Sequence, residues 1–572
     1  MMLIERLYTE PATIDPIVFT AGVNVILGES DVTSSKNNGV GKSLCIEFLN
    51  FALLKRKTES RVARIPKESF DPRNLICVDF RLHGIGYTIK RSLEEAEHPR
   101  IIVDGRETVY AKLKDATDFL TGRLFPDQDE QVGFREILGP LIRDERSEFK
   151  SIVGCFDTKA RIPDNYAPHL MLLGIDLGIY RAIKGIQREL DAIATEEARI
   201  KDSVRLVRQK DLDDARSDLN ALDEEVETIR QGIDALENAP AYDIVKGEIL
   251  DIEDRMSDLR RSKDVLVQRA ANLAPIALEP GIDSGEIRDF YDQLRAGLGT
   301  SIVRELAEVI TFKSKIEQFQ RHLLDEKSRV VDVEIRNLNK QLAELDRRYA
   351  KLVAVLDQKG QLRNLRQTYA SFQAKSDELG QLKSFFSRYD QLLIERQTKK
   401  SEIEAERLAL QASISAAADR LRSFERTILA IHQFIQGNRK ASFEVRTTPR
   451  KHVVDIVLRI DDDGSHSVER EKVFIYDIAL LLNDYTKSRH PGLLVHDNIF
   501  DVDDDTLRKS LEFILTRARL DENKQYILTL NVDRIEHARE EVWYYELEQS
   551  VVASFTKSNR FLKAQYQEVG RE

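Results

Sequence analysis

Hydrophobic residues recur at intervals of three and four along most of the middle of the chain. Such series run from Leu219 to Leu236, from Ile335 to Leu356 and from Ile403 to Ile435. These intervals place the apolar side chains on one face of a helix, and such a face persists where a partner helix buries it. The segment from about residue 178 to residue 440 is therefore predicted to form a long antiparallel coiled coil.

Two stretches interrupt this helical pattern. Asn238-Ala239-Pro240 breaks the first half, and Ala274–Gly285 contains two prolines and two glycines. Proline removes a helix donor and glycine relaxes the backbone, so the second stretch is predicted to be the point where the chain reverses. The returning half is longer than the outgoing half. Either part of residues 287–319 folds at a tip near 274–320, or some helix packs elsewhere.

A phase change is also visible in the outgoing half. The apolar series that ends at Val207 is one position out of step with the series that begins at Leu219. We expect a local irregularity between the two residues.

Short apolar runs separated by turn residues flank the helical region on both sides. They are Val23–Leu27, Ile76–Phe80 and Tyr87–Ile89 before it, and Val453–Ile460, Leu493–Val495 and Tyr526–Leu530 after it. Strands that alternate with helices are typical of a sheet covered by helices. Neither flank resembles a full domain, so residues 1–177 and 441–572 are predicted to be two halves of one α/β head, brought together by the coiled-coil arm of residues 178–440.

Composition agrees with long solvated helices attached to a compact domain, since 32% of the 572 residues are charged and 7% are aromatic. The formal net charge of -11 argues against adhesion to DNA by bulk charge, so any contact with nucleic acid requires a local basic patch. The three cysteines fit neither a metal site nor a disulfide framework. No run approaches the ~20 apolar residues that span a membrane, and the N-terminus lacks a signal-peptide pattern. We expect a cytoplasmic protein.

A glycine-rich loop lies between a predicted strand and a predicted helix. It is Asn38-Gly39-Val40-Gly41-Lys42-Ser43, and it follows Val23–Leu27. Glycines let backbone N–H groups turn toward phosphate oxygens, and the helix N-terminus adds its positive end. All six residues are predicted to bind ATP, with Lys42 at the β- and γ-phosphates and Ser43 as a ligand of Mg²⁺. Lys36 stands where the strict pattern has its first glycine, and Gly28 is the candidate for that displaced glycine.

A second motif follows the coiled coil. Leu493-Leu494-Val495-His496-Asp497 is a mostly apolar run that ends in an aspartate. Such a strand holds the Mg²⁺ shell through its carboxylate, so Asp497 and Ser43 are the predicted metal ligands.

The two motifs and the coiled coil between them resemble the SMC/RecN/RecF class of ABC-type ATPases and, more narrowly, the bacterial YydD-like family. The resemblance rests on four stretches, at residues 35–43, 473–477, 496–501 and 526–531. It implies a split ABC-type P-loop ATPase head that binds ATP and Mg²⁺. It also implies a homodimer in which two ATP molecules lie between the P-loop of one head and the signature motif of the other. Ser467, in Ser467–Arg470, is the nearest counterpart of that signature motif, and the alternative interpretation is a solvated turn between Asp461 and Glu471.

Two positions depart from the pattern of a fast ATPase. The class usually has a water-activating glutamate after the aspartate and a histidine after the next strand, where this chain has Asn498 and Asn531. An amide cannot take a proton from water at neutral pH. Asp497, Asn498, Asp501 and Asn531 are therefore the predicted catalytic set, and Asp501 and Asp503 could substitute as the base or shape the dimer contact. The alternative is that the two aspartates cap the next helix. Hydrolysis is expected to be slow until a partner or DNA closes the heads.

The resemblance leaves two functions open. YydD-like proteins resemble components of bacterial conflict and phage-defence operons, which implies protein partners from the same operon. The first function is a DNA-associated ATPase, and the second is an ATP-switched scaffold that positions proteins without binding DNA. Arg61, Arg64 and Lys67 form a small basic cluster, for which a solvated surface is the simpler interpretation. Gln128 and Gln131 lie in a plausible region for a Q-loop but have no supporting pattern.

Overall fold

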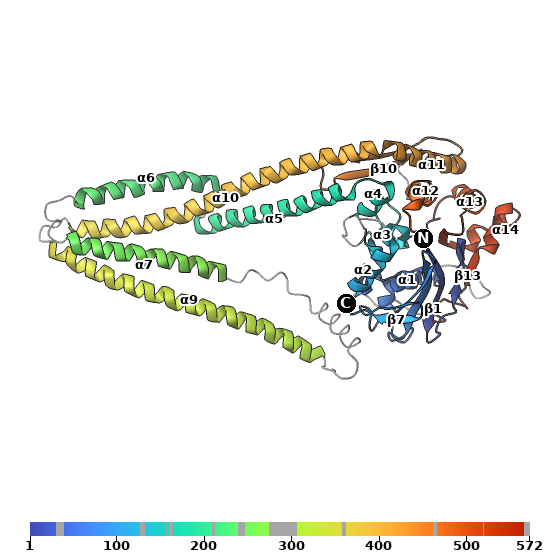
Figure 1. Cartoon of the computed structure of the whole chain (residues 1–572), viewed down its shortest axis with the longest axis horizontal. Helices are drawn as coiled ribbons and strands as arrows, with labels where there is room; N and C mark the ends of the chain where they lie inside the picture. Colours follow the sequence, from blue (N-terminus) through green and yellow to red (C-terminus); the bar gives the residue numbers. More distant parts are fainter. Residues whose placement is uncertain are drawn as a thin grey trace. The chain divides into compact units, whose positions relative to one another are not determined.

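The computed structural model describes residues 1–29, 39–125, 132–155, 157–159, 164–208, 212–237, 246–273, 306–356, 362–461, 466–518 and 520–565. Two compact units divide the chain. One unit is formed by Met1–Gly185 and Ile403–Glu572, and the other by Ile186–Asp289 and Arg304–Glu402, as far as the described residues show. We refer to them as the head unit and the arm unit, and Figure 1 shows their elements.

A parallel sheet lies at the centre of the head unit. Its strand order is β13-β3-β12-β11-β8, with β3 at Gly22–Gly28, β8 at Ile142–Arg143, β11 at Leu493–His496, β12 at Gln525–Asn531 and β13 at Val551–Phe555. All four neighbouring pairs are parallel. The central strands are almost entirely buried, as expected for a parallel sheet covered on both faces. Strands from both ends of the sequence contribute to this sheet, with β3 between β13 and β12 and β8 beside β11, so the two halves form one α/β fold.

A second, antiparallel sheet is built from the N-terminal half alone. Its order is β2-β1-β4-β5-β6-β7, with β1 at Met2–Glu10, β2 at Ile17–Val18, β4 at Leu75–Leu82, β5 at Ile85–Arg91, β6 at Arg100–Val103 and β7 at Arg106–Val109. Buried and more exposed positions alternate along most of β1, the period that a sheet with one buried face requires. Gly84 turns the chain between β4 and β5 with a positive φ of 83°.

Helices complete the head unit. They are α1 at Lys42–Ala52, α2 at Leu113–Leu124, α3 at Phe134–Leu141, α4 at Ala167–Leu173, α11 at Ala418–Gln436, α12 at His466–Leu482, α13 at Asp504–Glu512 and α14 at Val542–Gln549. A hairpin of β9 (Ala441–Thr447) and β10 (Val454–Ile460) packs with α11 and α12. Residues 473–481 of α12 are all buried, so this helix belongs to the core.

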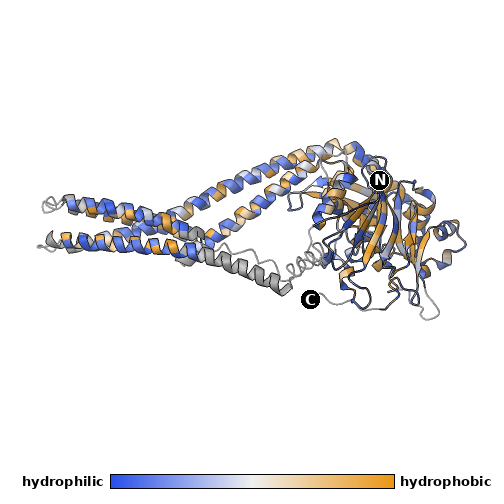
Figure 2. Cartoon of the chain, turned by 60° about the horizontal axis from the view of Figure 1, so that its bottom comes forward, coloured by the Kyte–Doolittle hydropathy of each residue, from blue (hydrophilic) through white to orange (hydrophobic). Residues whose placement is uncertain are grey.

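Long helices form the arm unit. They are α5 at Leu177–Arg208, α6 at Leu212–Glu237, α7 at Lys246–Leu273, α9 at Leu306–Leu356 and α10 at Leu362–Ala416; α5 begins and α10 ends in the head unit. Hydrophobic and hydrophilic residues alternate along these helices (Figure 2). The apolar faces pair as predicted: α5 and α6 share one buried cluster with α10, and α7 shares another with α9.

Ion pairs give the direction of the first pairing. Arg388 of α10 contacts Glu196 of α5, whereas Lys383, earlier in α10, contacts Asp223 of α6. The contact position moves forward from α5 to α6 while it moves backward along α10, so these segments of the chain form an antiparallel coiled coil.

The described helices stop short of both predicted irregularities. Helix α6 is described as far as Glu237 and α5 as far as Arg208. Asn238-Ala239-Pro240 and residues 209–211 lie outside the described residues, so both irregularities stay predictions. The reversal predicted at Ala274–Gly285 lies outside the described residues, and the part of the predicted tip from Leu306 onward belongs to α9. No helix in the described part of the chain is both long and apolar enough to cross a membrane.

Candidate nucleotide-binding site

The glycine-rich loop leads from β3 into α1. Gly39 and Gly41 have φ values of +75° and +113°, which glycine adopts without strain. Gly41 is the N-cap of α1, so the first N–H groups of that helix have no intrahelical acceptor and remain available to an anion. A side chain at Gly41 would also meet Phe561, because its Cβ would lie 2.5 Å from the Phe561 Cβ. Asn38, the first residue of the predicted motif, lies outside the described residues.

Lys42 is held between the ends of two parallel strands. Its Nζ donates a hydrogen bond of 2.5 Å to Oδ1 of Asn531, the last residue of β12. A Cβ at Gly28, the last residue of β3, would meet the Lys42 Nζ, so a side chain there would displace the end of the lysine. Partial burial lowers the pKa of Lys42, whereas Asp497, Asp533 and Glu145 oppose this shift. The Asn531 amide oxygen thus holds the Lys42 ammonium group in place, and a phosphate oxygen can replace it as the acceptor.

Asp497 meets Ser43 across a sequence separation of 454 residues. Oδ1 of Asp497 accepts hydrogen bonds from the Ser43 hydroxyl at 3.1 Å and from the Thr529 hydroxyl at 2.9 Å. Burial raises the pKa of Asp497 to about 6, and the carboxylates of Glu145 and Asp144 add to the rise while the two hydroxyls oppose it. A buried carboxylate surrounded by other carboxylates is a position that a cation stabilises.

The donor set at this position suits Mg²⁺. A serine hydroxyl and a carboxylate are hard oxygen donors, and Mg²⁺ binds few protein ligands because it keeps waters and phosphate oxygens. Ser43 and Asp497 would hold such an ion, which would offset the negative charge of the phosphates. Among the described residues, no group of three His, Cys, Asp or Glu side chains could hold a metal ion by itself. A metal here would depend on a bound phosphate for further ligands.

Asn498 follows Asp497 in a left-handed backbone conformation, with φ of +61°. Its N–H donates to the Thr529 hydroxyl at 2.9 Å, and its carbonyl accepts from Nη1 of Arg470 at 2.6 Å. These two bonds fix an uncommon backbone geometry that asparagine tolerates better than most residues. The side chain is thereby placed so that Nδ2 lies 3.4 Å from Oε1 of Glu145.

The two aspartates behind this strand lie in different environments. The side chain of Asp503 caps α13 and accepts a hydrogen bond of 2.9 Å from the N–H of Thr506. The capping interpretation is therefore confirmed for Asp503. Asp501 is exposed, and its Oδ2 lies 3.6 Å from Arg470.

A buried charge pair supports the sheet behind the site. Arg143 of β8 and Asp477 of α12 are both fully buried and make hydrogen bonds of 2.6 and 3.1 Å. Oδ2 of Asp477 also lies 3.0 Å from Nε2 of His496, the residue before Asp497. Burial and Arg143 act in opposite directions on the pKa of Asp477, which is lowered on balance. These contacts connect α12 to the strands that carry the predicted metal ligand.

Glu145 is a site residue that the sequence motifs did not predict. Together with Lys42, Ser43, Asn498 and Asn531 it lines a cavity of about 420 Å³ in front of the P-loop. A neighbouring cavity of about 300 Å³ is lined by Glu145, Asn498 and Asn531 again, and by Asp501. The strand before Glu145 is only two residues long, so no hydrophobic period could have revealed it. The only sequence feature that pointed to Glu145 was the run of charged residues formed with its neighbours Asp144 and Arg146.

The C-terminal segment at residues 556–565 closes the other side of this cavity. Nη1 of Arg560 donates to the Gly39 carbonyl at 3.2 Å, and the N–H of Phe561 donates to the Val40 carbonyl at 3.2 Å. The Phe561 ring packs edge-on against Phe48 of α1, with centroids 5.0 Å apart. Arg61, from the predicted basic cluster, also lines the cavity.

Ser467 lies in the first turn of α12 and is partly buried. A solvated turn is therefore the wrong interpretation for residues 466–471, which are helical. Gln128 and Gln131, considered for a Q-loop, lie outside the described residues.

The head unit is thus an α/β fold in which a strand, a glycine-rich loop and a helix meet an aspartate from a neighbouring parallel strand. A family model described as an uncharacterised protein conserved in bacteria (DUF2326) matches residues 430–566. The uncharacterized protein YydD of Bacillus subtilis (strain 168) is 27% identical over 138 residues. That alignment covers 23% of this chain and 23% of YydD.

Solved Smc structures align over most of the chain at low similarity. The Smc head domain with a coiled coil and joint from Pyrococcus yayanosii has a TM-score of 0.35 and 14% identity, covering 92% of each chain. The Smc head domain with an extended coiled coil bound to the C-terminal domain of ScpA, from Pyrococcus furiosus, has a TM-score of 0.32 and 10% identity, covering 94% of this chain and 92% of that one. At these TM-scores the likeness carries no conclusion about this chain.

Proposed function

We propose that this chain is an ATP-binding protein that hydrolyses ATP slowly, with the nucleotide at the P-loop of the head unit. The observation that carries the proposal is the hydrogen bond between Ser43 and Asp497, residues 454 positions apart in the chain. A serine at a helix N-terminus and a buried aspartate on a neighbouring strand form the pair that holds a magnesium–phosphate complex in P-loop NTPases. Lys42 beside them supplies the positive charge.

Slow turnover is the second part of the proposal. Asn498 occupies the position after the metal-binding aspartate, and its amide cannot accept a proton from water. Asn531, which bonds to Lys42, likewise offers no group that titrates near neutral pH.

The test is nucleotide binding by titration calorimetry with wild type and Lys42→Ala. Lys42 contributes charge to the phosphates and little to packing, so the variant is expected to lose measurable ATP affinity while its thermal unfolding stays unchanged. Lys67→Ala is the matched control, because Lys67 is exposed and does not line the cavity. Equal ATP affinity in wild type and Lys42→Ala would contradict the P-loop assignment.

We further propose that two heads pair around ATP and that Ser467 of one copy faces the nucleotide of the other. Ser467 supports this only by its place at the N-terminus of α12, where helix N–H groups suit an anion. ATP-dependent pairing of the heads could serve either of two functions, DNA association or protein scaffolding. Each would involve protein partners from the same operon. Binding to a DNA duplex that appears with ATP and weakens steeply with salt would favour the first. ATP-dependent capture of partner proteins without DNA binding would favour the second.

A further inference from the structure

Glu145 leaves the sheet at the same edge as the predicted metal ligand. It begins the short helix Glu145–Ser147, two residues after β8, and β8 is the parallel neighbour of β11. Residues that follow parallel neighbours emerge at one edge, the carboxyl edge, where ligands of α/β sheets bind. Glu145 and Asn498 accordingly approach each other to 3.4 Å and line both cavities in front of the P-loop.

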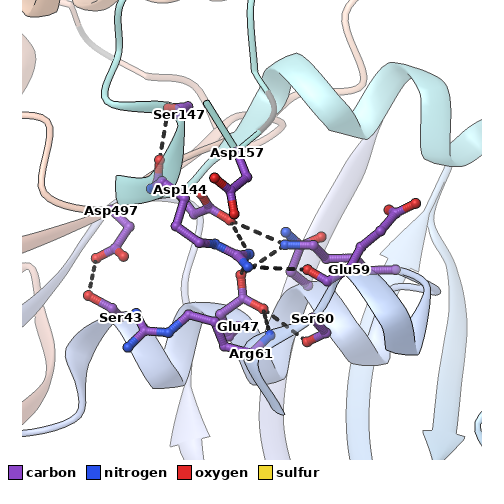
Figure 3. Close-up of polar contacts among 12 residues, drawn as sticks. Ser43, Glu47, Glu59, Ser60, Arg61, Asp144, Ser147, Asp157 and Asp497 are labelled. Carbon is purple, nitrogen blue, oxygen red and sulfur yellow. Dashed lines mark hydrogen bonds and ion pairs between the residues drawn. The ribbon is translucent and has the colours of Figure 1, made fainter. Parts of the chain in front are cut away.

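The residues on either side of Glu145 are anchored to the P-loop helix. The Asp144 carboxylate contacts Lys55 Nζ at 3.2 Å and Arg146 Nη2 at 2.7 Å, and Arg146 also contacts Oε1 of the buried Glu47 at 2.7 Å (Figure 3). Glu47 lies one turn beyond Ser43 on α1 and also accepts hydrogen bonds from the Ser60 hydroxyl and from the Arg61 N–H. Contacts on both sides of Glu145 therefore fix its backbone relative to the loop that would hold the phosphates.

The turn itself adds to this anchoring. Oδ1 of Asp144 accepts from the N–H of Arg146 at 3.0 Å, and the Ser147 hydroxyl donates to the Asp144 carbonyl at 2.8 Å. Burial alone would raise the pKa of Asp144. The positive charges of Lys55 and Arg146 outweigh this effect and hold the pKa well below its usual range. The network is thus an ionised support, and Glu145 is the carboxylate in the turn that lines the P-loop cavity.

The other candidate carboxylates are less well placed. Asp503 is engaged as the cap of α13, and Asp501 is exposed near Arg470 and does not line the P-loop cavity. Asp497 bonds to Ser43 and is the predicted metal ligand.

We propose that Glu145 is the general base of ATP hydrolysis in this protein, supplying the carboxylate that Asn498 lacks. This inference rests on the ATP site proposed above. The oxygen of a water molecule attacks the γ-phosphorus while its proton passes to the Glu145 carboxylate. The bond from the γ-phosphorus to the β–γ bridging oxygen breaks, so ADP and inorganic phosphate are formed and Glu145 later returns the proton to solvent. The Asn498 amide orients the Glu145 carboxylate through the contact at 3.4 Å.

The experiment compares the full-length wild type with Glu145→Gln, which keeps the shape of the side chain and removes its basicity. ATP affinity by calorimetry is expected to stay within about threefold, because the base acts on the transition state and not on ground-state binding. Turnover is expected to fall about 10²–10⁴-fold. After incubation and gel filtration, the nucleotide retained by Glu145→Gln is expected to be ATP, whereas the wild type retains ADP. Glu145→Asp is expected to keep partial turnover, because it keeps a carboxylate.

Glu148→Gln is the matched control. Glu148 lies in the same turn region, pairs with Lys150 and does not line either cavity. The same carboxylate-to-amide change there is expected to leave binding and turnover at the wild-type level.

The outcomes separate the two proposals. Wild type that binds no ATP contradicts the ATP site itself. Wild type that binds ATP but shows no turnover contradicts hydrolysis and, with it, the role of Glu145, but leaves the ATP site standing. Glu145→Gln that turns over at the wild-type rate overturns the role of Glu145 alone. If Asp501→Asn loses turnover and Glu145→Gln keeps it, the general base is Asp501 and the role proposed for Glu145 is wrong. Loss of ATP binding in Glu145→Gln with unchanged thermal unfolding also overturns that role, because Glu145 would then be a binding residue.

Discussion

Individual residues near the P-loop show how burial changes the cost of a charge. Asp497 is buried among hydroxyls and other carboxylates, and its pKa is raised to about 6. Asp477 is equally buried but faces a guanidinium, and its pKa is lowered. The difference lies in the partner, since desolvation penalises both carboxylates in the same way.

The Arg143–Asp477 pair provides the first stability prediction. Asp477→Asn leaves a fully buried guanidinium without a counter-charge, so the free energy of unfolding is expected to fall by about 3–5 kcal/mol. Urea unfolding of the full-length chain is the measurement. Asp71→Asn is the control: Asp71 pairs with Arg73 at an exposed position, and its removal is expected to leave the unfolding midpoint nearly unchanged. Equal midpoints for Asp477→Asn and wild type would show that the pair is not coupled to folding.

His490 provides a prediction about pH. It is buried, its Nδ1 accepts from the N–H of Gly492 at 3.0 Å, and burial lowers its pKa to about 3. The unfolded chain has a histidine pKa of about 6.5, so below that pH the unfolded state binds more protons and stability is lost toward pH 3.

His490→Asn keeps an acceptor for Gly492 and removes the titration. The loss of unfolding free energy between pH 6.5 and 5 is expected to be smaller than in the wild type by roughly 1–2 kcal/mol. Urea unfolding at several pH values checks this, and parallel curves for the two proteins would contradict it.

Among the elements, the strand–loop–helix unit of β3 and α1 depends on packing from the distant C-terminal segment. Phe561 packs against Phe48 of α1 and fills the space beside Gly41. Phe70 packs on the same Phe48 ring, with centroids 5.1 Å apart. Neither ring lines the cavity, but Phe561 alone of the two lies beside Gly41 and bonds to the Val40 carbonyl. Comparing the two phenylalanines therefore separates packing on the helix from packing on the loop.

Phe561→Ala is expected to lower the free energy of unfolding by about 3–5 kcal/mol and also to weaken ATP binding, because the loop loses the wall beside Gly41. Phe70→Ala is the control, expected to lower stability by a similar amount with ATP affinity retained. Calorimetry on both variants at a temperature where each is folded makes the comparison. Equal ATP affinities in the two variants would rule out a role of the Phe561 side chain in nucleotide binding.

At the scale of the whole molecule, the proposed switch is head pairing around ATP. If two nucleotides lie between two heads, pairing depends on the γ-phosphate, so ATP is expected to produce a dimer that ADP does not. Sedimentation of the full-length chain with ATP, ADP and no nucleotide measures this. The same profile in all three conditions would contradict it.

A shortened protein that lacks the arm tests whether the heads alone form the dimer. The predicted arm of residues 178–440 includes α11, but α11 packs in the head unit with α12 and β9. Joining Gly185 to Ile403 therefore keeps the buried residues of α11, such as Phe424 and Ile428, in the core of the head. ATP-dependent dimerisation is expected to persist in this version, and its loss would show that the arm carries the contact.

Sequence alone determined the parts of this protein that depend on local patterns. Apolar runs predicted the buried strands β3, β11 and β12, and apolar residues at intervals of three and four predicted the arm helices. The glycine-rich loop could be singled out as a candidate phosphate site because its glycines, lysine and serine are adjacent in the chain, and its role stays a prediction.

Tertiary structure decided what depends on residues far apart. A strand of two residues has no period, so the place of β8 beside β11, and with it the position of Glu145 beside Asn498, could not be predicted. The same holds for Phe561 against Gly41, for Arg143 against Asp477 and for α11 in the head core. In each case the stabilising free energy comes from burying groups that only the folded chain brings together. The order of residues along the chain does not indicate such a contact.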